Sequence, residues 1–304
     1  MSFFKAIIFP AVFVVLFAGC KQKETEPKLI FKFKFDPTQE RLDGFGNPSS
    51  LPANHGGQNP TFNGMTAHYI ELAQGALTQV GTGAVLYHAA ETNAGGSKGI
   101  DFSKATPTKD GEVFYEMPLK NVSAGEYEYL RVSLAYQNYD VKLFFDTSFT
   151  VSGFPVNISQ EDPCTVASFI GYNTYIGSYK VKTKTITVND DKLQGYWGFE
   201  YAANFSGYPF EFLSTGQAPG TTVVNPLALT SPIPAGSCLV TGKFDQGKLK
   251  IQGNETKDIV VTVSLSTNKS FEWIEAGTPD GKWEPTKGES IVDMGIRGMK
   301  PSFQ

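Results

Sequence analysis

The sequence has few of the residues that usually form catalytic or metal-binding sites. Its 304 residues include three histidines, three cysteines and three tryptophans. It contains no His-Glu-x-x-His motif and no Walker-type phosphate-binding loop. Glycoside hydrolysis needs two carboxylates at a set separation, which depends on the fold. Pairs such as Glu200 and Glu211 therefore keep a hydrolase as an alternative. We nevertheless expect a protein that is not an enzyme.

The chain also lacks a strong excess of either charge. It has 26 basic and 30 acidic side chains and a formal net charge of −4. Lys5 is the only charged residue among residues 1–19, so 25 basic and 30 acidic side chains remain without them, a net charge of −5. Nucleic-acid binding usually needs a strongly positive surface, so we do not expect nucleic acid as a partner.

Only one long apolar run occurs, at residues 6–18, and it is too short to span a bilayer as a helix. It follows Lys5 and ends in Ala18-Gly19-Cys20, which resembles a bacterial lipobox, with Phe17 where leucine is usual. We predict a lipoprotein signal peptide over residues 1–19 and acylation, for example with palmitate, at Cys20. The alternative is an ordinary secretory signal cleaved nearby, with no special role for Cys20.

The segment after the signal peptide, residues 20–28, is polar, charged and interrupted by proline. Such a composition predicts a disordered tether. Residues 29–304 are expected to form a single domain. An acylated Cys20 would hold this domain to the lipid bilayer of the outer membrane in the bacterial cell envelope. The tether carries both positive and negative charges, so its sequence fits a domain on the periplasmic face as well as one on the surface-exposed face.

Two cysteines remain when Cys20 is set aside. Cys164 follows Asp162-Pro163, and Cys238 follows Gly236-Ser237, so each lies beside turn-forming residues. An even pair in an oxidising compartment favours a disulfide between Cys164 and Cys238. The alternative is two free, buried thiols.

Alternating apolar residues predict β-strands along most of the chain. In residues 29–35 the even positions after Ile30 are lysines, and the odd positions are Leu or Phe. Related patterns occur at residues 113–119, 127–136, 141–145, 178–188, 193–201 and 259–265. Residues 64–77 fit a helix and a strand equally well. The pattern predicts an all-β antiparallel sandwich of many short strands, with long loops and little helix.

Two short polar segments predict hairpin turns. Residues 189–192 (Asn-Asp-Asp-Lys) separate the strand at 178–188 from the next strand. Residues 245–247 (Asp-Gln-Gly) separate segments 242–244 and 248–251. Both contain residue types that favour turns, so each is expected to connect two paired strands.

The three histidines, His55, His68 and His88, all fall within one 34-residue stretch that also contains Met65. Imidazole with thioether suits copper, whereas imidazole with carboxylate suits zinc and other divalent ions. No two histidines have i, i+2 or i, i+4 spacing, so the fold would have to assemble any site. We predict a metal site from His55, His68, His88 and Met65. The alternative is three unrelated histidines.

Residues 196–212 contain eight aromatic side chains. Alternating members would build a core. The others, Tyr196, Trp197 and Tyr208 among them, would form an exposed surface that stacks on a glycan or contacts a protein partner.

The order of segments resembles that of the MbnP-like family of copper-associated periplasmic proteins. The shared segments are residues 29–35, 67–72, 122–127 with 130–132, 194–199 and 258–265. The resemblance implies a β-sandwich with a copper site. In that family a histidine and a modified tryptophan are associated with the metal, and Trp197 is the nearest candidate by position.

These patterns predict a non-enzymatic, membrane-anchored envelope lipoprotein that binds a metal ion, copper among the candidates, through a histidine-containing site. The alternative function is a glycan- or protein-binding assembly module that uses the aromatic segment.

Overall fold

The computed structural model describes residues 26–43, 46–205, 207–218, 229, 232, 234 and 236–304. Within these ranges the chain is all-β, as predicted, and its helical turns are short 3-10 segments at Phe102–Lys104, Leu119–Asn121 and Pro285–Lys287. None of the helices in the described ranges has the length and apolarity to cross a membrane.

One sheet joins segments from both halves of the chain. Its order is β20 (Met299–Phe303), β17 (Ile259–Ser266), β1 (Lys28–Asp36) and β7 (Val113–Pro118). β1 runs parallel to β17, with Leu29 opposite Ile259 and Asp36 opposite Ser266. The first described strand is therefore central in this sheet and depends on a strand more than 200 residues later.

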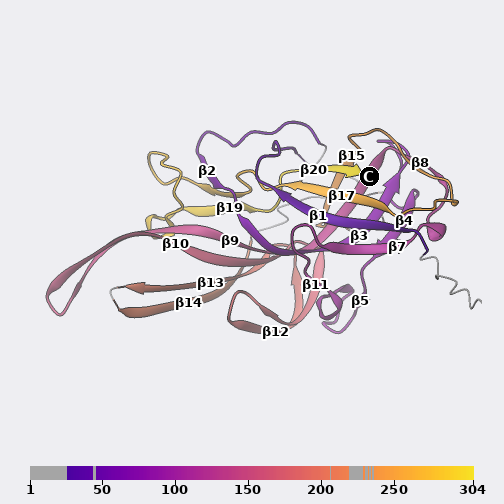
Figure 1. Ribbon diagram of the computed structural model, residues 1–304. Coiled ribbons are helices and arrows are strands. Elements are labelled where there is room, and N and C mark those ends of the chain that lie inside the picture. Colours follow the sequence, from indigo (N-terminus) through magenta and orange to yellow (C-terminus); the bar gives the residue numbers. More distant parts are fainter. Residues whose placement is uncertain are drawn as a thin grey trace, which may run out of the picture.

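The largest sheet has the order β14 (Tyr208–Gln217), β13 (Tyr196–Phe205), β10 (Phe154–Phe169), β9 (Tyr129–Val151), β3 (Thr61–Ala73) and β4 (Ala84–His88). β15 (Cys238–Lys243) pairs with the first part of β9. β9 and β10 project together as a long hairpin, with the β13–β14 hairpin beside them (Figure 1). The predicted strand at 127–136 is part of β9 from Tyr129 on, and the one at 141–145 lies within β9 as well.

Three smaller sheets complete the described fold. The first has the order β12 (Thr185–Leu193), β11 (Asn173–Lys180), β6 (Gly99–Asp101) and β5 (Glu91–Thr92). The second has the order β19 (Ser290–Met294), β18 (Phe271–Ile274) and β2 (His55–Gln58). The third pairs β16 (Leu249–Ile251) with β8 (Gly125–Tyr127).

The main core lies between the β1-containing sheet and the part of the large sheet formed by β3, β4, β9 and β15. Alternate side chains of β1, Leu29, Phe31 and Phe33, are fully buried there, as the sequence pattern predicts. β10 is covered on both faces, because Val166 belongs to a cluster with Trp283 and Phe169 to a separate cluster on β11.

Residues 64–77 are mostly strand, since β3 extends to Ala73. The turn predicted at residues 189–192 is wrong. The chain reverses earlier, where Val181 N–H donates to the Lys184 carbonyl, and β12 continues through Asn189. Asn189 has φ 51°, and the β11–β12 register shifts beside it. Asparagine tolerates this left-handed conformation, so the residue forms a bulge and the strand does not end.

The second predicted hairpin is also wrong. A turn forms at Phe244–Gly247, where Gly247 N–H donates to the Phe244 carbonyl at 3.2 Å. The flanking strands do not pair with each other, because β15 pairs with β9 and β16 pairs with β8. Leu249 and Ile251 of β16 are buried in the main core beside Tyr127, which favours this non-local pairing.

Candidate functional site

The candidate site lies where β3, β4 and β5 meet. His68 is in β3, His88 is the last residue of β4, and Glu91 is the first residue of β5. Tyr69 and His88 are opposite each other in the antiparallel β3–β4 pair, and Ala89 N–H donates to the His68 carbonyl at 2.7 Å. Strand pairing therefore brings the backbones of the two histidines close together.

A β-bulge sets the direction of the His68 side chain. On the β9 side of β3, Ala67 is opposite Leu134 and Tyr69 is opposite Ser133. His68 is the extra residue between these pairs. Bulges change the direction of a side chain relative to regular strand alternation, and this one places the imidazole of His68 against that of His88, with ring centroids 5.0 Å apart.

The three side chains have donor atoms at metal-ligand spacing. His68 Nε2 lies 3.8 Å from Glu91 Oε1, and His88 Nε2 lies 3.6 Å from the same oxygen. One donor atom from each residue falls within 4.8 Å of the others. Two ligands of a tetrahedral zinc ion, each about 2.05 Å from the metal, are separated by about 3.4 Å. A small contraction would therefore place all three around one ion.

His68 is fully buried, and Nε2 has no hydrogen-bond partner among the described residues. Its Nδ1 lies 3.4 Å from Ser133 Oγ. Burial, together with the charge of His88, lowers the pKa of His68 to about 4, so the ring is neutral at physiological pH. When Nδ1–H donates to Ser133, the lone pair of the neutral ring is on Nε2 and faces Glu91.

Glu91 is held by two further side chains. The Tyr172 hydroxyl donates to Oε1 at 2.6 Å, and Lys98 Nζ lies 2.7 Å from Oε2. Burial acts to raise the pKa of Glu91, but the hydrogen bonds from Lys98 and Tyr172 and the charge of His88 hold it below its usual value. The carboxylate is therefore ionised, with Oε1 directed toward the imidazoles.

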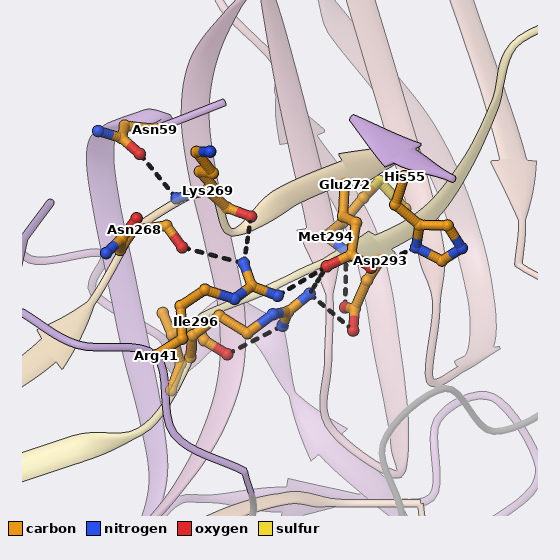
Figure 2. Close-up of polar contacts among 10 residues, drawn as sticks. Arg41, His55, Asn59, Asn268, Lys269, Glu272, Asp293, Met294 and Ile296 are labelled. Atoms are coloured by element: carbon orange, nitrogen blue, oxygen red, sulfur yellow. Dashed lines mark hydrogen bonds and ion pairs between the residues drawn. The ribbon is translucent and has the colours of Figure 1, made fainter. Parts of the chain in front are cut away.

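His55 lies in β2, in a different sheet. Its Nδ1 is 2.6 Å from Glu272 Oε1, while Glu272 Oε2 accepts from Arg41 at 2.8 Å and from Arg297 at 3.5 Å (Figure 2). Arg297 also pairs with Asp293 at 2.8 Å. Burial acts to raise the pKa of Glu272, and the hydrogen bonds from His55 and Arg41 lower it overall. His55 belongs to this ionic network, and the structure does not bring it to His68 and His88.

Met65 is fully buried in the main core. Its backbone N–H donates to the Thr108 carbonyl at 3.0 Å, and its side chain is packed among hydrocarbon groups. The thioether therefore has a packing role, and the donor set at the candidate site is imidazole and carboxylate.

The aromatic residues predicted to form one stacking surface are separated. Tyr196 is buried against Phe169 and Tyr179, with ring centroids at 5.9 and 6.1 Å. Trp197, the next residue, faces the opposite side of β13 and borders an apolar cavity. The side chain of Tyr208 lies outside the described part of the structure. β10 and β9 separate β13 from β3, so Trp197 is not adjacent to His68.

The predicted disulfide is wrong, since both thiols are free and buried. Cys164 is in the cluster that contains Trp283, and its Sγ lies 3.5 Å from the Val141 carbonyl. Cys238 begins β15 and belongs to the main core. Burial raises the pKa of both thiols, that of Cys238 to about 12. The two cysteines lie in separate hydrophobic clusters, which explains why they do not bond. Cys20 and the signal peptide lie outside the described residues.

Sequence reasoning missed Glu91, Tyr172 and Lys98. The spacing His88-x-x-Glu91 was the available signal for the carboxylate, whereas the fold alone brings Tyr172 there. Residues 95–99 also match the Gly-x-Ser-x-Gly spacing of a hydrolase elbow, but Ser97 Oγ donates to Asp191 at 2.7 Å and lies between two short strands, without the strand-to-helix turn of that motif.

Comparisons with known proteins give no match for this chain, whether with family models, curated proteins or solved structures. The resemblance to the MbnP-like family stays a prediction from the order of segments.

Proposed function

We propose that this protein binds a divalent transition-metal ion through His68, His88 and Glu91. The observation that carries the proposal is the buried Nε2 of His68, which has no hydrogen-bond partner among the described residues and lies 3.8 Å from a carboxylate that also approaches His88. A buried polar atom normally has a partner. A metal ion shared with His88 and Glu91 would supply one.

The donor set favours a borderline divalent ion. Two imidazoles and one carboxylate suit Zn²⁺, and Cu²⁺ binds the same donors with high affinity. The side chain of His88 is 40 % exposed, whereas that of His68 is fully buried. The ion would thus reach the site from the His88 side, where a water molecule or an external ligand would complete its coordination.

The role we propose is binding, without catalysis. Glu91 is used as a ligand, and Tyr172 and Lys98 already hold its two oxygens.

We further propose that an acylated Cys20 anchors the protein to the envelope membrane. A Cys20→Ser variant should then lose labelling by radioactive palmitate and appear in the soluble fraction. Unchanged labelling would reject the anchor without affecting the metal proposal.

The metal proposal is tested by titrating the metal-free protein with Zn²⁺ and with Cu²⁺ in a calorimeter. We expect one ion per chain, with at least 100-fold weaker binding in His88→Ala and Glu91→Gln. The partly exposed position of His88 makes that variant the one expected to keep its fold, which circular dichroism would check.

His55→Ala is the matched control, because it removes an imidazole outside the site. It should bind as the wild type does. If neither ion binds the wild type stoichiometrically, or if His55→Ala loses binding while His88→Ala keeps it, the assignment is wrong.

A further inference from the structure

An apolar cavity of about 360 Å³ lies on the opposite side of the large sheet from β11 and β12. Its floor is formed by β9, β10, β13 and β14, and its roof by Trp283, Pro285 and β19. The roof is attached to β9, because Phe144 N–H donates to the Trp283 carbonyl at 2.8 Å and Lys287 pairs with Asp146. The cavity is therefore an open space between two connected layers.

The wall of this cavity is almost entirely hydrocarbon. Among the described residues no charged side chain borders it, and the polar groups are those of Ser214, Trp197, Trp283 and Tyr201. The Tyr201 hydroxyl donates to Asp162 at 2.6 Å, so its polar end is already engaged. A glycan needs several hydrogen-bonding groups, which this wall does not offer. The cavity suits an apolar ligand.

The arrangement of the rings favours a flexible chain over a flat ring system. Phe199 meets Phe212 at an interplanar angle of 64° and Trp283 at 85°. These three rings therefore do not form a parallel slot in which a planar ligand would stack. Phe145 and Tyr201 are parallel, but their ring centroids are only 6.3 Å apart, less than the roughly 7 Å needed to admit a third ring between them. Phe210 and Phe212 are 42 and 48 % exposed, so the apolar surface continues from the cavity along the edge strand β14. An elongated ligand would cover both parts.

The charged groups near the roof argue against an anionic head group. Lys287 lies 2.7 Å from Glu284 and 3.4 Å from Asp146. This cation already has two carboxylate partners, so it offers no net attraction to an anionic ligand.

We propose that the cavity between β13–β14 and the Trp283 segment binds the hydrocarbon chain of a single-chain lipid with an uncharged head group. Its position is separate from the His68–His88–Glu91 site, so each proposal stands or falls without the other. A lipid chain would remove water from Trp197, Phe199 and Phe212, which is the main source of favourable free energy in apolar binding.

The probe is 12-bromododecanol, whose bromine quenches tryptophan fluorescence at short range. Trp197 and Trp283 border the cavity, whereas Trp273 is fully buried in the same hydrophobic cluster as Trp283 and does not border the cavity. We expect saturable quenching of roughly half or more of the emission at about one probe per chain. Replacement of Trp197 and Trp283 by Phe together should remove most of the quenching, because Trp273 does not border the cavity.

Ser214→Leu fills the cavity and should weaken quenching by at least 10-fold. Thr215→Leu is the matched control, because its side chain is exposed on the other face of the same strand. Equal quenching in both variants, or none in the wild type, would overturn the proposal. So would quenching by brominated phosphatidylcholine vesicles alone, which would indicate insertion into a bilayer. Dimerisation that Ser214→Leu abolishes, without any quenching, would assign the cavity to a second copy of the chain.

Discussion

His68 Nε2 and Glu91 Oε1 face each other at 3.8 Å, a separation too long for a hydrogen bond and close to that of two ligands on one metal ion. The other ring nitrogen of His68 is 3.4 Å from Ser133 Oγ. Ser133 is therefore the hydrogen-bond partner that would orient the ring, accepting from Nδ1–H when Nε2 binds a metal ion.

We predict that Ser133→Ala weakens Zn²⁺ binding by about 10-fold, because loss of the partner that orients a ligating histidine typically costs 10- to 100-fold in affinity. Competition with a coloured chelator would measure the change. Ser168→Ala is the control, since it removes a buried hydroxyl from β10 in the same sheet. Equal affinities of Ser133→Ala and the wild type would contradict the proposed role of Ser133.

The stability of the metal-free protein should depend on pH through His68. Its pKa is about 4 in the folded state and about 6.5 in the unfolded state, so the unfolded chain binds more protons between these values. The contribution of neutral His68 to the free energy of unfolding is complete above pH 6.5 and is lost as the pH falls toward 4. At pH 5 the loss should reach about 2 kcal/mol relative to pH 7.5.

Urea unfolding at pH 7.5 and pH 5 measures this loss. Carboxylates also titrate in this range, so the informative quantity is the difference from His68→Gln, in which the His68 contribution is absent. His88→Ala keeps the burial of His68 but removes the charge of His88 that also lowers its pKa, so this variant should show a smaller pH dependence than the wild type and a larger one than His68→Gln. An identical pH dependence in His68→Gln and the wild type would show that burial does not depress the pKa of His68.

Cys164 and Cys238 should be free thiols, without a disulfide, that are protected from alkylation in the folded protein. Their thiols are buried in separate hydrophobic clusters, and burial raises both pKa values, so little thiolate is present to react. Iodoacetamide should leave both unmodified in native protein and modify both in urea without reductant, as seen by mass spectrometry. Modification in urea only after reduction would show a disulfide.

Glu272 should be essential for stability. It joins His55, Arg41 and Arg297, and it borders a cavity of about 370 Å³ with both charged and apolar walls. Glu272→Ala leaves two largely buried guanidinium groups without their shared partner, and we expect a loss of about 3–5 kcal/mol in the free energy of unfolding. Glu211→Ala removes an exposed ion pair with Lys184 and should cost about 0–1 kcal/mol. Similar losses in the two variants would be inconsistent with this network.

The sequence predicts those features of the fold that depend on the local alternation of apolar and polar residues. Phe31 and Phe33 are buried, as their spacing in β1 requires. The partners of β15 and β16 could not be predicted in the same way, because a turn at residues 245–247 forms whichever strands flank it. Long-range pairing was decided by which buried side chains pack together.

The metal site shows the same difference between local features, which the sequence predicts, and long-range features, which it does not. Chain proximity favoured all three histidines with Met65, but strand pairing and a bulge selected His68 and His88 alone. A one-residue bulge changes which face a side chain occupies, and no pattern of polarity around His68 signals it. Glu91 could be predicted from its spacing to His88, whereas Tyr172, in the connection between β10 and β11, reaches the site only through the fold.

The parallel pairing of β1 with β17 has a consequence for the order in which the molecule is made. β1 has β17 on one side and β7 on the other, so its sheet is incomplete until residues 259–266 have been synthesised. Contacts this distant in sequence slow folding, because a long loop must close before they form. A nascent chain would therefore stay uncompacted at its N-terminal end for most of translation, the condition in which a polypeptide is threaded most easily through a membrane pore.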